Sequence, residues 1–177
     1  DSLFNVGDRV AFNFTAPQTA RYFKVRQVST VWNSDKQEFT TSEINFFENK
    51  IPQKVTVPTQ ALDRTDWTGS ITPKNNGAFT DASFKSIIDG DLSTYPDEGG
   101  PGQGNHNGFP INVDLNLGSE QTVKSFSLDK RPGAGNAADG KNGTVGAFEV
   151  FTSEDGTNWV SAGKGAFTEA AYNLHQV

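Results

Sequence analysis

The feature that most constrains this chain is a series of short segments in which apolar and polar residues alternate. Residues 112–117 are the cleanest case, with Val113, Leu115 and Leu117 on one face and polar residues between them. A two-residue period is typical of a β-strand with one buried face. The same period recurs in five further segments, at 10–14, 21–28, 42–47, 123–129 and 146–152. The sequence therefore predicts about eight short strands and no long amphipathic helix.

The composition agrees with a fold built from strands and turns. Only 34% of the 177 residues are hydrophobic, while Gly (18) and Phe (14) are abundant. Such a mixture suits many short strands joined by turns, and the length suits one domain. We expect an all-β chain, an antiparallel β-sandwich or jelly roll that occupies residues 1–177. The opening strands, up to residue 48, are too few to enclose a core alone, so they must complete a sheet formed with later segments.

Charge and composition exclude several classes of function. The formal net charge of −6 provides no basic surface for nucleic acid. No apolar run reaches the length needed to span a membrane. The chain has no cysteine, so neither disulfides nor thiolate metal sites are available. We therefore expect no nucleic-acid partner and no membrane insertion.

Residues 86–98 form a short polar loop that is rich in oxygen-bearing side chains. Asp89, Gly90 and Asp91 supply two carboxylates around a glycine that can bend the backbone carbonyls inward. Calcium prefers such a set of carboxylate and carbonyl oxygens. The loop is not an EF-hand, because counting from Asp89 places Thr94 at position six and Gly100 at position twelve. The residues by themselves leave two interpretations open, a cation site or a solvated surface turn.

Several segments resemble the discoidin family, also called coagulation factor 5/8 C-type, and its bacterial relatives in carbohydrate-binding module family 32. The matching pieces are IDGDLST at 88–94, PINVDLNLG at 110–118, FEVFTSEDGTNW at 148–159, ARYFKV at 20–25, SEINFF at 42–47 and Arg131. Together they span nearly the whole chain. The resemblance implies a discoidin-like jelly roll in a secreted protein, extracellular or on the cell surface.

The order of these pieces differs from that of the family. Residues 1–48 resemble the family's C-terminal strands, residues 49–58 are a connection, and residues 59–177 resemble its N-terminal and central strands. Two explanations are available. One is a circularly permuted domain within a single chain, and the other is a swapped oligomer, for example a homodimer, in which each part pairs with another copy. We favour the permuted domain, because the two parts together supply each family strand once.

The resemblance also implies a structural calcium site that joins the two parts of the chain. Carried over to this sequence, its carboxylates come from Asp89 and Glu43, and Thr94 offers a carbonyl or hydroxyl oxygen. The remaining backbone carbonyls come from Ser86, Asp91 and Ser42. The alternative is that Asp89 only caps its turn while Glu43 faces solvent.

For ligand binding, the bacterial relatives hold terminal sugars with an Arg, a His and an aromatic ring. Arg131 falls at the family's Arg position, and Trp32 and Phe39 lie in the loop that supplies the ring. The family's Trp-His after Tyr95 is replaced here by Pro-Asp, which argues against galactose-type recognition. Other residues that can serve in its place are Tyr95, Asp97, His106 and Asn142. Each of these residues also has a purely structural interpretation, as a core plug, an ion-pair partner or a solvated loop residue.

Catalysis has little support in the sequence. The two histidines, His106 and His175, do not occur in a metal-ligand spacing, and there is no cysteine nucleophile. The acidic residues concentrate in the loop already assigned to a cation. Together with this lack of catalytic residues, the resemblance implies a non-catalytic carbohydrate-binding module of a bacterial extracellular or cell-surface protein. The alternative is a structural or adhesion module that packs against other domains or proteins and binds no sugar.

Overall fold

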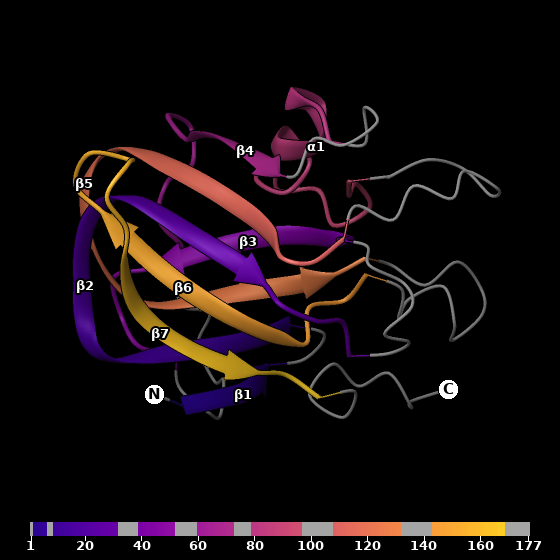
Figure 1. Cartoon of the computed structure of the whole chain (residues 1–177), viewed down its shortest axis with the longest axis horizontal. Helices are drawn as coiled ribbons and strands as arrows, with labels where there is room; N and C mark the ends of the chain where they lie inside the picture. The colour runs from indigo at the N-terminus through magenta and orange to yellow at the C-terminus, as the bar shows by residue number, and fades with distance from the viewer. Residues whose placement is uncertain are drawn as a thin grey trace, which may run out of the picture.

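The protein is mostly β, with one short helix and an antiparallel sheet (Figure 1). The computed structural model describes residues 2–6, 9–31, 39–51, 60–72, 79–96, 108–131 and 143–168. All strand pairings within these ranges are antiparallel, which confirms the β-rich antiparallel fold expected from the sequence. Among these elements, no helix combines the length and the apolar character that crossing a bilayer requires. The elements are β1 (Ser2–Val6), β2 (Arg9–Gln27), β3 (Thr41–Phe47), β4 (Thr68–Thr72), α1 (Asp81–Lys85), β5 (Ile111–Lys130), β6 (Ala147–Ser153) and β7 (Val160–Ala166).

Two long strands, β2 and β5, run through the whole sheet. The start of β2 pairs with the end of β5, and the end of β2 pairs with the start of β5. Register shifts between Asn13 and Gln18 and between Ala20 and Tyr22 accompany the bend that both strands make at the left of Figure 1. The sequence predicted four short strands here. That prediction was wrong, because cross-strand pairing continues through the bend and joins each pair of short strands into one.

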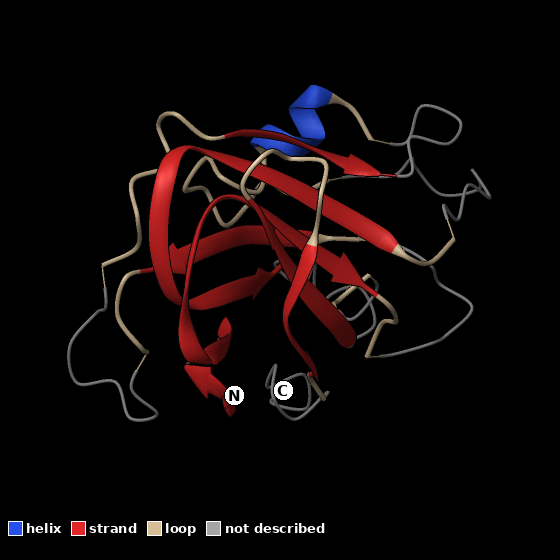
Figure 2. Cartoon of the chain, turned by 60° about the vertical axis from the view of Figure 1, so that its left-hand side comes forward, coloured by secondary structure: helices blue, strands red, loops and turns tan. Residues whose placement is uncertain are grey.

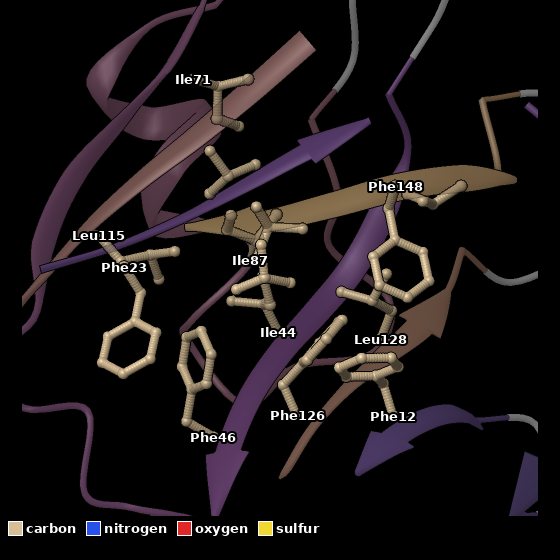
Figure 3. Packing of buried hydrophobic residues seen from close by; sticks show 14 of the residues in the cluster. Phe12, Phe23, Ile44, Phe46, Ile71, Ile87, Leu115, Phe126, Leu128 and Phe148 are labelled. Atoms are coloured by element: carbon tan, nitrogen blue, oxygen red, sulfur yellow. The ribbon is translucent and has the colours of Figure 1, made fainter. Parts of the chain in front are cut away.

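The bend divides the sheet into two halves whose apolar side chains meet in one core. One half contains β1 and β3, and the other contains β4, β6 and β7. Aromatic rings connect the halves (Figure 3). The ring centroids of Phe12 and Phe148 lie 5.3 Å apart, and those of Phe23 and Phe46 lie 4.9 Å apart. The core is therefore shared between segments that are distant in sequence.

The alternation in the sequence identifies the core correctly. Every residue predicted to point inward from its strand is at most 3% exposed. Two aromatic residues outside these alternating segments, Trp67 and Phe79, are also buried, at 5% and 2% exposed. The confirmed inward residues are Val10, Phe12, Phe14, Ile44, Phe46, Val113, Leu115, Leu117, Phe126, Leu128, Phe148 and Val150.

The strands of the first 48 residues complete the sheet within the same chain. β2 lies between β5 and β6, and β3 pairs with the other side of β5. On the outer side of this half, Asn13 donates to the carbonyl of Ile51 and accepts from its N–H, both at 2.9 Å. The Ser125 hydroxyl donates to the carbonyl of Asn49 at 2.8 Å. These bonds fasten the start of the connection to the sheet, while residues 52–58 lie outside the described part of the chain.

Strand β4 and helix α1 were not expected from the sequence. They lie beside each other at one edge of the sheet (Figure 2). Thr80 caps the helix by accepting from the Ser83 N–H, and Phe84 is buried beneath it. A Cβ at Gly69 would lie 2.0 Å from the Asp114 carbonyl oxygen and 2.5 Å from the Phe84 ring, so only glycine fits this crossing. The five-residue helix forms no full period of apolar spacing, which is why its pattern is invisible in the sequence.

Candidate functional site

A carboxylate from β3 forms the centre of the candidate cation site. Glu43 is only 2% exposed, although its side chain is ionisable. Its Oε2 accepts a hydrogen bond from Arg64 Nη1, and its Oε1 accepts one from the Gly90 N–H at 2.8 Å. Glu43 therefore joins three segments: β3, residues 60–67, and residues 86–94 of the polar loop, which we call the acidic loop. Buried carboxylates require such partners, because burial without them costs several kcal/mol.

The position of Glu43 follows from an irregularity in β3 and from backbone bonds around it. The register with β5 shifts between Thr41 and Glu43, so Ser42 is the inserted residue. The Ile44 N–H donates to the carbonyl of Ile87 at 2.8 Å, which fixes the acidic loop against β3. The Ser42 hydroxyl donates to the Lys130 carbonyl at 3.3 Å, so this side chain is directed to β5 rather than to the loop.

The acidic loop is curled around the hydroxyl group of Thr94. Asp89 Oδ2, the carbonyl of Asp91 and the carbonyl of Ser86 lie 2.8, 2.9 and 3.3 Å from Thr94 Oγ1. Gly90 has a φ of 84°, a conformation that favours glycine and allows the curl. The structure thus brings together four of the predicted cation ligands from this loop, namely Ser86, Asp89, Asp91 and Thr94.

The two predicted carboxylate ligands lie side by side. Burial raises the pKa of the Glu43 carboxyl, and its contact with the Asp89 carboxyl acts in the same direction. Arg64 and the Gly90 N–H oppose this rise by stabilising the charged form. Glu43 and Asp89 meet within one chain, as the permuted arrangement of segments requires. Two carboxyl groups in contact provide a suitable pair of ligands for a hard cation.

The Asp91 side chain has a different role from its carbonyl group. Its Oδ1 accepts from the Ser93 N–H at 2.9 Å and from the Ser93 hydroxyl at 2.6 Å. These two hydrogen bonds lower the pKa of the Asp91 carboxyl. The side chain therefore closes a local turn, and only the Asp91 carbonyl faces the cluster, as the sequence-based assignment of ligands proposed.

The donor set of this loop fits a hard cation. The Thr94 hydroxyl has one proton, but three oxygen atoms lie within 3.3 Å of it, so it cannot satisfy them together. Within the described residues, no three His, Cys, Asp or Glu side chains gather as a metal-binding group. A cation would therefore rely on two carboxylates, Asp89 and Glu43, supplemented by carbonyl and hydroxyl oxygens, a combination typical of calcium.

Arg64 was not identified from the sequence. It lies in a polar stretch, residues 62–66, that carries no motif. The backbone holds it in place, because the Leu62 N–H donates to the Phe46 carbonyl at 2.8 Å and the Trp67 N–H donates to the Arg64 carbonyl at 3.0 Å. An open pocket of about 480 Å³ lies beside it. The pocket is lined by Asp63, Arg64, Thr65, Trp67, Lys85, Ile88 and Asp89.

A second candidate site brings together two of the predicted ligand-binding residues. The Arg131 guanidinium carbon lies 5.5 Å from the centre of the Tyr95 ring. Arg131 Nε is buried and has no hydrogen-bond partner within the part of the chain that the structure describes. A buried N–H without an acceptor is costly, so this donor is suited to a ligand oxygen. Arg131 follows directly on β5, and Tyr95 follows the acidic loop, so both are positioned by the elements that form the cation site.

The other predicted ligand-binding residues are not part of this pair. Phe39 is 1% exposed and belongs to the apolar core, so its ring has no free face for a sugar. Its assignment as a stacking platform was wrong, because the ring packs inward. Trp32, Asp97, His106 and Asn142 lie outside the described residues.

Comparison of the sequence with models of protein families found no match, and comparison with curated proteins found none.

Proposed function

We propose that the protein is a non-catalytic carbohydrate-binding domain of an extracellular or cell-surface bacterial protein, with a structural calcium ion. The observation that carries this proposal is the pair formed by Arg131 and Tyr95, in which a buried guanidinium N–H has no hydrogen-bond partner among the described residues. The pair offers two features that sugar-binding sites use. The guanidinium is a charged donor for hydroxyl oxygens, and the aromatic ring can pack on the C–H face of a sugar ring.

The arrangement of strands supports a discoidin-like β-sandwich as the scaffold. Two halves of a bent antiparallel sheet contribute to one core, which is what two packed sheets joined at a bend would produce. The strands of residues 1–48 pair with later strands in the same chain. This pairing supports a circularly permuted domain over a swapped one.

Calcium would be held by the Glu43 and Asp89 carboxylates, the carbonyls of Ser86 and Asp91, and Thr94. When bound, the ion supplies positive charge that links the acidic loop to β3. The residues of this loop then position Tyr95, which follows Thr94 directly in the chain. In this proposal the cation acts as a structural support for the sugar site and takes no part in a reaction.

The alternative, an adhesion or structural module without sugar binding, has less support. The buried centre of such an interface is more apolar than the rest of the surface. The large hydrophobic residues exposed within the described part of the chain are Val28, Leu92 and Val160. Three such residues are few for the apolar centre of a docking surface.

A glycan array followed by calorimetric titration tests the proposal. We expect saturable binding of at least one glycan, weakened about tenfold or more by Arg131→Ala. Arg21→Ala is a matched control, because Arg21 stacks on Tyr22 at 5.3 Å in a similar geometry elsewhere on the sheet. Binding should survive this control. Absence of binding across a broad panel would favour the adhesion module, and equal affinity of both variants would remove Arg131 from the site.

A further inference from the structure

We propose that Arg64 competes with the calcium ion for Glu43, so that calcium binding is an exchange of one positive charge for another. This inference rests on the proposed cation site. It starts from the ion pair between Arg64 Nη1 and Glu43 Oε2, in which the Arg64 side chain is 18% exposed and the Glu43 side chain 3% exposed. The guanidinium is thus a cation that the chain itself supplies to the buried carboxylate.

Arg64 and the ion would both lie beside the Glu43 carboxylate. Arg64 Nη1 also lies 3.3 Å from the Ile44 carbonyl, and a Cβ at Gly90 would lie 3.5 Å from Arg64 Nη2. The guanidinium therefore contacts β3 and lies next to the side of Gly90 where a Cβ would be. Because Asp89 contacts Glu43 from the acidic loop, a divalent ion shared by the two carboxylates would lie close to a fixed positive charge. Simultaneous binding of both cations is electrostatically unfavourable.

The structure also provides a place for the displaced side chain. The pocket beside Arg64 opens next to Asp63, whose Oδ1 accepts from the Thr65 N–H at 3.0 Å and from its hydroxyl at 2.7 Å. These hydrogen bonds lower the pKa of the Asp63 carboxyl and keep it charged. Arg64 can therefore leave Glu43 for a site with space and a neighbouring negative charge, without moving the backbone that holds it.

The exchange sets the calcium affinity of the site. Release of the guanidinium from Glu43 is a cost that an open site would not have, so calcium binds more weakly than its oxygen ligands alone would allow. Weak sites in extracellular modules fill at about 10⁻⁴–10⁻³ M calcium. The site would then respond to calcium outside the cell, with Arg64 supplying the positive charge beside Glu43 when calcium is scarce.

Terbium titration measures the competition directly. Terbium(III) is a luminescent substitute for calcium, and Trp67 lines the pocket next to Asp89, where its indole can sensitise the ion. We expect Arg64→Gln to bind terbium and calcium about tenfold or more tightly than the original chain, since one opposing charge is removed. Arg9→Gln is the matched control, because Arg9 forms the same kind of ion pair with the buried Asp129, at 2.9 Å. The affinity of Arg9→Gln for terbium and calcium should differ from that of the original chain by less than about twofold.

A second measurement uses the unmodified protein, in case Arg64→Gln does not fold. The side-chain Nε–H resonance of Arg64, assigned by its loss in Arg64→Lys, should shift during a calcium titration with the same midpoint as the terbium signal. The resonance of Arg9 should not shift. A stationary Arg64 resonance in a protein that binds calcium overturns the exchange and leaves the cation site in place.

The remaining outcomes separate the two ideas. Equal calcium affinity of Arg64→Gln and Arg9→Gln also overturns the exchange alone. If neither variant nor the original chain binds calcium or terbium at millimolar concentration, the proposed cation site itself is wrong. Sugar binding measured in the same samples then decides whether the carbohydrate proposal stands without the cation.

Discussion

Two acidic turns of the protein, residues 89–94 and residues 153–158, have similar residue types but different hydrogen bonding. In the second turn, Asp155 Oδ1 accepts from the backbone N–H groups of Asn158 and Thr157, both at 2.8 Å. Its Oδ2 accepts from the Asn158 side-chain amide at 2.7 Å. The N–H groups of Asn158 and Thr157 lower the pKa of Asp155 far below its usual range. This carboxylate is saturated by donors from its own turn.

In the first turn, the donors are divided among several acceptors instead of converging on one carboxylate. Asp89 Oδ1 accepts from the Asp91 N–H at 2.8 Å, and Oδ2 shares the single Thr94 proton with two carbonyl groups. The Glu43 carboxyl adds a further acceptor. The comparison teaches that the concentration of N–H donors on one carboxylate, rather than the number of carboxylates, distinguishes an acidic turn that closes on itself from one whose acceptors share few donors.

The largest expected effect comes from removing the buried carboxylate at the first turn. Glu43→Ala leaves Arg64 without its partner beside the core and deletes the link between β3 and the acidic loop. We expect a loss of about 3 kcal/mol in the free energy of unfolding, measured by urea denaturation. Glu154→Ala changes an exposed residue of the second turn and should alter the free energy by less than about 0.5 kcal/mol. A small effect of Glu43→Ala would mean that the ion pair does not support this region.

The second-largest expected effect is stabilisation by calcium, which should depend on the first turn and not on the second. At a calcium concentration of 100 Kd, binding stabilises the native state by about 2.7 kcal/mol, which raises the melting temperature by about 5–10 °C. Chelation by EDTA should remove this gain. Asp89→Asn should lose most of the calcium-dependent shift, whereas Asp155→Asn should keep it while melting lower overall. A shift that persists in Asp89→Asn would place the bound calcium elsewhere on the protein.

Two glycines give a smaller and more direct comparison. Gly90 and Gly156 have φ values of 84° and 75°, so alanine at either position costs about 1–2 kcal/mol in backbone strain. We expect Gly90→Ala and Gly156→Ala to destabilise the protein by similar amounts in urea denaturation. Only Gly90→Ala should also weaken calcium binding, because the Gly90 N–H orients Glu43. Equal calcium affinity in both variants would show that this orientation is unimportant.

The pH dependence of the second turn gives the smallest effect. The pKa of Asp155 is lower in the folded protein than its reference value of 3.8, so the charged form stabilises the native state. This contribution is present above pH 3.8 and is lost as the pH falls from there toward the folded pKa. Asp155→Asn should therefore be less stable than the original chain at pH 6, and the difference should shrink below pH 3.8 in parallel thermal melts. A constant difference across this range would show that the hydrogen bonds of Asp155 do not depend on its charge.

The sequence predicted the β-rich antiparallel fold because burial of one strand face leaves a local pattern. It failed where the pattern is interrupted without the strand ending, as near Pro17 and Gly118, where β2 and β5 bend together. Proline and glycine at such points also signal turns, and only the partner strand decides between the two. The prediction for Phe39 failed for a related reason, since the sequence around a lone aromatic residue in a loop is the same whether its ring packs inward or faces solvent.

In the candidate sites too, some residues could be identified from the sequence and others only from the structure. The acidic loop could be identified from the sequence because its oxygen-rich side chains are contiguous. Arg64 could not, because it is 21 positions from Glu43 and no local pattern marks it as a partner. The unpartnered Nε of Arg131 is likewise a property of its surroundings, which the residue type does not reveal.

By itself, the sequence determined which faces of the strands are buried and which loop concentrates carboxylates, because both depend on neighbouring residues. The tertiary structure alone decided that Glu43, Arg64 and Gly90 meet, across 47 positions in the widest case. Electrostatic interactions act through space rather than along the chain, so the balance of donors, acceptors and charges at this site exists only after the strands have paired.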